Sequence, residues 1–180
     1  MEVYIITPFP DSINILIENN IANQGVKKGL LSIETINLRD FTKDNYKKID
    51  DEPYGGGSGM VMMCEPLFSA IEYCISKSQK KPKIIFPSPK GKVLNHKISS
   101  DLSNESSLIF ICGHYKGVDE RVIEKYVDLD VKFLVGGRKK GDSFLTLNDL
   151  NIPKELQHIF IDIPEKLFRE DISSTDIRNN

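Results

Sequence analysis

Three glycine-bearing segments hold the residues of this sequence that are best suited to binding a ligand. Residues 50–67 read DDEPYGGGSGMVMMCEPL, and four of the five residues from Gly55 to Gly59 are glycine. Residues 87–91 (PSPKG) and 113–121 (GHYKGVDER) carry further glycines beside charged side chains. Glycine lets a backbone adopt positive φ or approach a ligand closely. A GGGSG run alone is more typical of a flexible surface turn, and it is the other two segments that favour a binding site.

These segments lie among elements whose order predicts an α/β fold with a largely parallel sheet. Apolar strands alternate along the chain with segments of helical period, as in such folds. Ligands of parallel sheets bind beyond the carboxyl ends of the strands. Both PSPKG and GHYKG directly follow an expected strand, so we expect the site between them. Strands are expected at 3–7, 31–38, 83–86, 108–112, 131–135 and 158–163. Helices are expected after Asp11, Pro66, Leu94 and Asp119 and over 146–156. A polar turn is expected at 138–143.

The composition is ordinary for a globular protein with one core. The chain has 180 residues, 39% hydrophobic and 28% charged, with a net charge of −2, so a polyanionic partner would have to use local basic patches. The three cysteines, Cys64, Cys74 and Cys112, show no CxxC spacing. We therefore expect buried free thiols in a reducing compartment and no metal site. No apolar run approaches the length of a membrane span, and we expect a cytoplasmic protein with no membrane contact.

The order of the motifs resembles the bacterial tRNA (guanine-N1)-methyltransferase family over about residues 1–128. The motifs are PFPD, GLLSIETINLRDFT, DDEPYGGGSGMVMM, SPKGKVL and ICGHYKGVDERVIE. The resemblance implies the SPOUT fold, an α/β parallel sheet with helices on both faces and a C-terminal trefoil knot, which is a rare exception to unknotted topology. It also implies a homodimer that uses S-adenosylmethionine to methylate guanine N1 in tRNA, at the guanosine just 3′ of the anticodon (position 37).

The same resemblance assigns roles to the three segments. The segments after the strands would bind the cofactor, whose adenine and methionine parts need close backbone approach. The glycine run would face the tRNA and its flipped guanine. The implied cofactor-binding residues are Phe86, Ser88, Pro89, Gly91, Gly113, Tyr115, Gly117, Phe133, Leu134 and Val135, and the implied substrate-binding residues are Asp50, Gly55, Gly56, Gly57 and Gly59.

Three departures from the family pattern concern the cofactor and the catalytic base. Where the family has GRYEG, this sequence has His114 and Lys116, and we expect a lysine beside a sulfonium to weaken binding by repulsion. The family's third cofactor segment is shortened here. Both a complete and an incomplete knot are therefore compatible with this sequence. The family's helical C-terminal domain, with its catalytic aspartate, is not recognisable, so the candidates for the base are Asp142 and Asp149.

The end of the chain has a second resemblance. Residues 172–178 read ISSTDIR, which is similar to the ISSTxIR motif of nicotinate-nucleotide adenylyltransferases, where it holds ATP phosphates at a helix N-terminus. The HxGH-type motif of that family is absent from the start of this chain. We therefore expect a methyltransferase-like domain over 1–137 and a divergent tail over 138–180. Two alternatives stay open: a catalytically impaired remnant joined to an adenylyltransferase fragment that binds only RNA or nucleotide, and a nucleotide-binding module that uses the tail.

Overall fold

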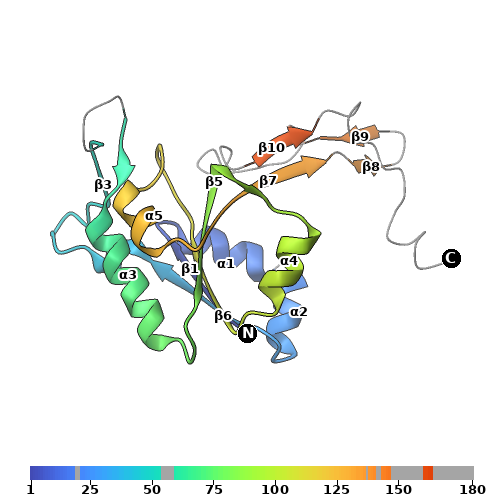
Figure 1. The fold of residues 1–180 in the computed structure, drawn as a ribbon, viewed down its shortest axis with the longest axis horizontal. Helices are drawn as coiled ribbons and strands as arrows, with labels where there is room; N and C mark the ends of the chain where they lie inside the picture. Colours follow the sequence, from blue (N-terminus) through green and yellow to red (C-terminus); the bar gives the residue numbers. More distant parts are fainter. Residues whose placement is uncertain (19–20, 54–58, 137, 141–142, 147–159, 164–180) are drawn as a thin grey trace.

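The protein is an α/β structure built on one parallel sheet (Figure 1). The computed structural model describes residues 1–18, 21–53, 59–136, 138–140, 143–146 and 160–163. Six strands pair in the order β10-β7-β5-β6-β1-β2, and each neighbouring pair is parallel. This architecture confirms the α/β class with a parallel sheet. The strands of the sheet are β1 (Glu2–Thr7), β2 (Ser32–Asn37), β5 (Lys83–Val93), β6 (Ser107–Ile111), β7 (Leu129–Gly136) and β10 (Phe160–Ile163).

Helices cover both faces of this sheet, as the alternation of side chains along the central strands requires. In β5, Ile84 and Phe86 belong to one buried cluster and Ile85 to another, and Ile109 and Leu108 of β6 divide in the same way. Strands buried on both faces read as continuous apolar runs, which is how these segments look in the sequence. The helices are α1 (Pro10–Glu18), α2 (Ile21–Lys27), η1 (Leu38–Phe41, a 3-10 turn), α3 (Cys64–Lys77), α4 (His96–Ser103) and α5 (Glu120–Tyr126).

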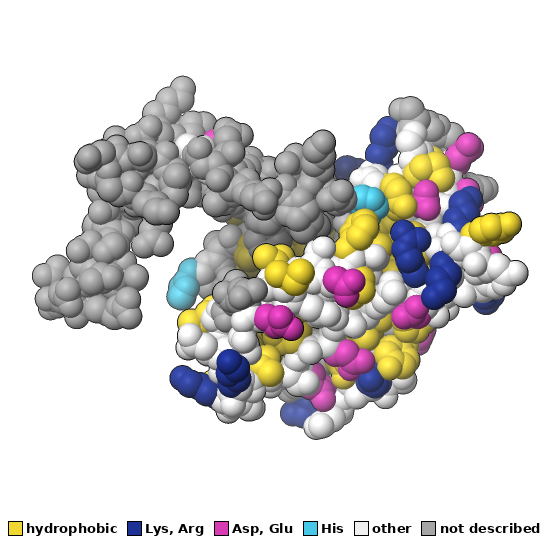
Figure 2. All heavy atoms as spheres, turned by 180° about the vertical axis from the view of Figure 1, so that it is seen from behind, with side chains coloured by type: hydrophobic (Ala, Val, Ile, Leu, Met, Phe, Trp, Pro, Cys, Tyr) yellow, Lys and Arg dark blue, Asp and Glu magenta, His cyan; other side chains and the backbone are white. Residues whose placement is uncertain are grey.

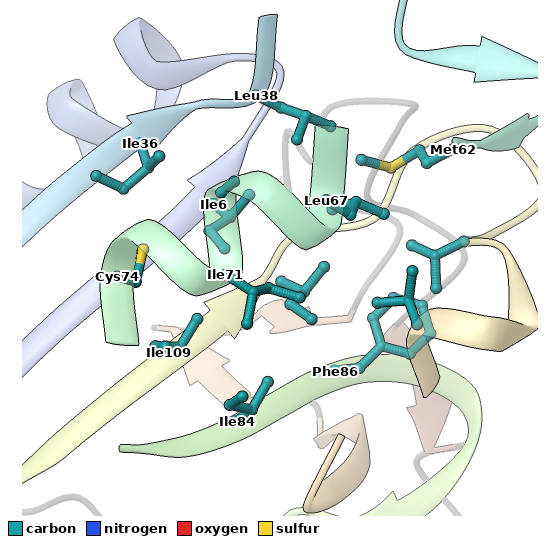
Figure 3. Close-up of a cluster of buried hydrophobic side chains, with 14 of the residues drawn as sticks. Ile6, Ile36, Leu38, Met62, Leu67, Ile71, Cys74, Ile84, Phe86 and Ile109 are labelled. Carbon is teal, nitrogen blue, oxygen red and sulfur yellow. The ribbon is translucent and has the colours of Figure 1, made fainter. Parts of the chain in front are cut away.

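The larger buried cluster lies between the sheet and the helices α3 and α5 (Figure 3). Leu67, Ile71 and Cys74 recur along α3 with the helical period and are fully buried against β1, β5 and β6. Figure 3 shows Met62 and Phe86 at the end of the cluster opposite Cys74. Met62 and Phe86 are themselves buried members of the cluster. The apolar core therefore reaches the segments that carry the motifs.

Small elements outside the main sheet form two short antiparallel pairs. In one, β3 (Asp50–Asp51) pairs with β4 (Val61–Met62) on either side of the glycine run. In the other, β8 (Arg138–Lys140) pairs with β9 (Ser143–Leu145). The polar turn expected over 138–143 is wrong for residues 138–140 and 143, which pair as strands, whereas residues 141–142 lie outside the described residues. The expected helix over 146–156 lies outside the described residues except for Thr146.

Three other sequence expectations need correction or limits. The helix expected after Asp11 is found as α1 and α2, on either side of residues 19–20, which lie outside the described residues. The strand expected at 83–86 continues to Val93, because the chain returns to β7 after the PSPKG segment. Of the three cysteines, all free, Cys74 is buried, whereas Cys64 and Cys112 are only partly buried. Burial raises the pKa of the Cys74 thiol to about 12, so this thiol stays protonated at neutral pH.

Candidate functional site

A cavity of about 220 Å³ lies between the PSPKG part of β5 and the segment that follows β6. The PSPKG segment contributes one wall and the segment from Lys116 to the start of α5 contributes the other. This is the place that the positions of the two motifs predict. A larger hollow of about 590 Å³ lies at the amino ends of β1 and β6, and its lining includes no residue of the PSPKG or GHYKG segments. The lining residues of the smaller cavity are Phe86, Ser88, Pro89, Lys90, Lys116, Gly117, Val118, Glu120 and Ile123.

The PSPKG segment forms a bulge that leaves β7 and returns to it. Pro87 and Lys92 both pair with Val131 of β7, so residues 88–91 project out of the ladder. Ser88 is buried, and its Oγ accepts a hydrogen bond from the Lys90 amide at 3.2 Å. Bulges of this kind redirect side chains at the edge of a site. The bulge therefore presents the 88–90 backbone to the cavity from a fixed base.

The GHYKG segment needs its glycines for two different physical reasons. A Cβ built on Gly113 would lie 3.0 Å from Cε2 of Phe86, so a side chain there would push against the ring that lines the cavity. Gly117 has φ +141°, a conformation that L-residues rarely adopt, and no atom lies within 4 Å of its Cβ position. Its backbone is therefore open to close approach by a ligand. Between them, Tyr115 adopts φ +61°, which is uncommon for a residue that is not glycine.

Backbone hydrogen bonds join this segment to the residues that follow the glycine run. The Lys116 amide donates to the Met60 carbonyl at 3.1 Å, the Met62 amide to the Gly117 carbonyl at 2.9 Å, and the Asp119 amide to the Met62 carbonyl at 3.0 Å. The His114 amide also donates to the Met62 sulfur. The cofactor segment and the substrate segment predicted from sequence thus share one backbone ladder. Movement of either one must disturb the other.

A polar cluster of Arg39, Asp50 and Tyr115 lies beside this ladder. The Tyr115 side chain interacts by hydrogen bonding with both Asp50 and Arg39, and burial, followed by the Asp50 charge, raises the pKa of Tyr115 above its usual value. The phenol is therefore neutral at pH 7 and can donate to the Asp50 carboxylate. Arg39 also donates from Nη1 to the Lys47 carbonyl at 3.1 Å. Asp50 is held at its backbone by pairing with Met62.

Helix α5 begins at the edge of the cavity with a capped N-terminus. The Asp119 carboxylate accepts from the Arg121 amide at 3.0 Å and pairs with the Arg121 guanidinium at 2.7 Å. These contacts with Arg121 hold the pKa of Asp119 below its ordinary value. The cap predicted from sequence at Asp119 is confirmed. It fixes the first residue of the helix, Glu120, on the cavity wall.

The structure places some of the residues predicted for the site at the cavity and others elsewhere. Phe86, Ser88, Pro89 and Gly117 line the cavity, and Gly113 contacts Phe86 from the neighbouring segment. Gly91 belongs to the bulge but is not among the lining residues. Tyr115 turns toward Asp50 and Arg39 rather than the cavity. Gly59 lies against Lys116.

The remaining predicted residues are placed only by their backbone or fall outside the described residues. Phe133, Leu134 and Val135 lie in β7, where they pair with Phe160, Ile161 and Asp162 of β10. Their assignment to the cofactor stays a prediction. The predicted site residues outside the described part of the chain are Gly55, Gly56, Gly57, Asp142 and Asp149, together with the 172–178 motif.

Sequence reasoning missed several residues that the fold brings to the site. Val118 and Ile123 line the cavity, and Arg39 contacts Tyr115 across the ladder. Val118 and Ile123 look like ordinary core residues in sequence. The available signal was the helix start at Asp119, which predicts that Glu120 faces the edge of the sheet where ligands bind. Arg39 gave no such signal, because its partners are distant in sequence.

Two features are absent from the residues that the structure describes. Within those ranges, no group of three or more histidine, cysteine, aspartate or glutamate side chains is arranged to hold a metal ion. Within the same ranges, no helix combines the length and the apolar character needed to cross a bilayer.

Comparison with known proteins matches residues 1–138 to the family model described as tRNA (Guanine-1)-methyltransferase TrmD. Two curated relatives carry the name tRNA (guanine-N(1)-)-methyltransferase. The one from Ruminiclostridium cellulolyticum is 39% identical over 150 residues, covering 83% of this chain and 61% of its own length. The one from Clostridium tetani is 43% identical over 142 residues, covering 79% of this chain and 55% of its own length.

A solved structure resembles the chain to a similar extent. The tRNA (m1G37) methyltransferase from Aquifex aeolicus superposes with a TM-score of 0.66 at 35% sequence identity, covering 81% of this chain and 62% of that one. The chain therefore spans between 55% and 62% of the length of these relatives. The matched residues include both walls of the cavity and the backbone ladder.

Proposed function

Because this chain belongs to the tRNA (guanine-1)-methyltransferase family, we propose that it transfers a methyl group from S-adenosylmethionine to N1 of a guanine in tRNA. The target would be the guanosine just 3′ of the anticodon, position 37, as the name of the Aquifex aeolicus neighbour indicates for that enzyme. The observation that carries the proposal is the cavity between the PSPKG bulge and the GHYKG segment, joined by a backbone ladder to the residues after the glycine run.

The residues of the cavity fit S-adenosylmethionine in their chemistry. Phe86, Val118 and Ile123 give apolar surface for an adenine ring, and the open backbone at Gly117 can be approached closely. Glu120 places a carboxylate on the wall, where it would favour a positively charged sulfonium. Small-molecule sites usually measure about 300–1,000 Å³, so this cavity of about 220 Å³ holds part of the cofactor. We propose that β7, through Phe133, Leu134 and Val135, supplies the remaining contacts.

The substrate would approach from the glycine run. Asp50, held by the β3–β4 pairing and by Tyr115, lies at the base of that run. A flipped guanine can be recognised by hydrogen bonds to its Watson–Crick edge, and Asp50 with Gly55, Gly56, Gly57 and Gly59 would supply them. When bound, the cofactor supplies an activated methyl group. The chain must hold guanine N1 in line with it and provide a base for the N1 proton. The candidates for that base are Asp142 and Asp149.

We also propose the homodimer and the knot that the family resemblance implies. The support for a dimer is apolar surface on α1 and the turn after α2: Leu16 is 54% exposed and Leu30 is 65% exposed. Figure 2 shows apolar side chains exposed between basic and acidic ones on the face opposite that of Figure 1. The support for the knot is the family resemblance alone, because the described residues do not show one. We further propose that the protein is cytoplasmic. We also propose a domain boundary near residue 137, followed by a divergent tail over 138–180.

The proposal is tested by methyl transfer and by two separate binding measurements. A tRNA transcript with guanosine at position 37 should accept a labelled methyl group, and a matched transcript with adenosine there should not. Calorimetry should detect binding of S-adenosylmethionine and none of ATP. Binding of RNA without transfer would favour the impaired remnant, and binding of ATP would favour a nucleotide site in the tail.

A further inference from the structure

Lys116 occupies a position between the cavity and the glycine run. Its side chain is among those that line the cavity, and its amide donates to the Met60 carbonyl on the other side of the ladder. The residue is exposed at the surface. It therefore contacts both of the segments that the proposed reaction must bring together.

The far end of the Lys116 side chain lies across Gly59. A Cβ built on Gly59 would lie 2.9 Å from Cδ, 2.6 Å from Cε and 3.2 Å from Nζ of Lys116. The lysine thus occupies the space that any other residue at position 59 would need, and Gly59 has φ +97°. The Lys116 side chain is directed so that its ammonium group lies against Gly59, the last glycine of the run.

We propose that Lys116 is a substrate-binding residue whose ammonium group binds a hydrogen-bond-accepting oxygen of the RNA beside Gly59. This inference rests on the proposed function. The oxygen is a backbone phosphate oxygen or O6 of the target guanine. An ammonium is a compact charge with three donors, suited to either acceptor. A phosphate contact would position the RNA. A contact with O6 would stabilise the negative charge that the guanine acquires when a base removes the N1 proton.

The position of the charge distinguishes this role from an effect on the cofactor. A lysine whose ammonium pointed into the cavity would repel the sulfonium. Here Nζ lies near Gly59, whereas Glu120 lines the cavity from the helix side. Lys116 can therefore raise the affinity for RNA without an equal loss of affinity for the cofactor.

The test is the substitution Lys116→Met in the full chain, because methionine keeps an aliphatic cover over Gly59 and removes the charge. Binding of an anticodon stem-loop RNA should weaken about tenfold, while the affinity for S-adenosylmethionine should stay the same or rise. Lys97→Met, at an exposed position of α4 that does not line the cavity, removes an equal charge and should change neither affinity. Unchanged RNA affinity in Lys116→Met, or an equal loss of cofactor affinity, would overturn the proposal.

Two further arms identify the oxygen. If it is a phosphate oxygen, the slope of log K against log salt should fall by about 0.7 to 1 in Lys116→Met. If it is O6, an RNA with 2-aminopurine at the target position should bind wild type and Lys116→Met equally. The proposal would be overturned if Lys116→Met had the same salt dependence as wild type and lost affinity equally for the guanosine RNA and the 2-aminopurine RNA. Neither oxygen could then be the partner of Lys116.

The result of this test can be distinguished from the result of the test of methyltransferase activity. RNA binding that depends on Lys116 without any methyl transfer would retain this inference and reject the methyltransferase activity. Methyl transfer with RNA affinity independent of Lys116 would do the reverse. A wild-type protein that binds no RNA at low salt would reject both.

Discussion

The two faces of the parallel sheet are packed very differently. On the α3 and α5 face, buried residues form a cluster that includes Ile6, Ile71, Ile109 and Val122, all with no exposed surface. On the α4 face the buried cluster is small, with Ile85, Leu102, Leu108 and Val131. The described residues of α1 and α2 include none that is buried. One face is a closed core, whereas the other leaves apolar side chains in contact with solvent.

This difference explains where the candidate site lies. Met62, Phe86 and Val118 belong to the large cluster, and each also adjoins the cavity or the ladder. Rigid packing beneath a site keeps its groups in position, which catalysis by positioning requires. The open face has no such role in the described residues, and its exposed leucines suit a contact with a second copy of the chain.

The largest effect should come from opening the large cluster. Ile71→Ala removes a fully buried side chain and should lower the free energy of unfolding by about 3 kcal/mol. Ile98→Ala, a half-buried residue of the small cluster, should cost less than half of that. Urea unfolding of both variants measures the difference. Equal losses would show that the two faces contribute alike.

The second effect concerns association through the open face. Leu16→Glu places a charge on the exposed apolar surface of α1 and should raise the dissociation constant of the proposed dimer at least about tenfold. The free energy of unfolding of the monomer should change little, because the side chain is exposed. Sedimentation equilibrium measures the association, with Gln24→Glu on α2 as the control. A dimer unaffected by Leu16→Glu would place the interface elsewhere.

The third effect tests the polar cluster beside the ladder. Tyr115→Phe removes the hydroxyl that interacts with Asp50 and Arg39 and should reduce kcat/KM for tRNA about fivefold. The affinity for S-adenosylmethionine should be nearly unchanged, because this side chain turns away from the cavity. Tyr126→Phe is the matched control, since its hydroxyl contacts Glu72. If both variants behave alike, the Tyr115 hydroxyl has no special role in positioning Asp50.

The smallest effect should come from the cap of α5. Asp119→Ala should cost about 1 kcal/mol at pH 7 through loss of the N-cap. The Arg121 contacts hold the folded-state pKa of Asp119 below its ordinary value of 3.8. The carboxylate therefore stabilises the fold fully above that value, and its contribution is lost as the pH falls through the lower folded-state pKa. The stability difference between wild type and Asp119→Ala should be constant from about pH 5 to 8 and should shrink in acid. A difference independent of pH below about 4 would contradict this account.

The sequence predicted the elements of the sheet well and the irregular segments poorly. Residues 3–7, 83–86 and 108–112 are apolar runs whose strand character depends on local composition, and all three are strands. The cap at Asp119 follows from one side chain and its neighbours and was also correct. The return of the chain to β7 after residue 91 was missed. It depends on pairing with Val131, which no local pattern indicates.

The sequence by itself therefore determined the α/β class, the family and the two segments that form the walls of the cavity, because these follow from local apolar runs, glycine positions and motif order. Only the tertiary structure decided that Met60–Met62 pairs with the 116–119 segment, that Tyr115 turns toward Asp50 and Arg39, and that Lys116 lies over Gly59. These contacts join residues that are far apart in sequence. Their geometry depends on backbone hydrogen bonds and positive φ angles that form only once the strands have brought the segments together.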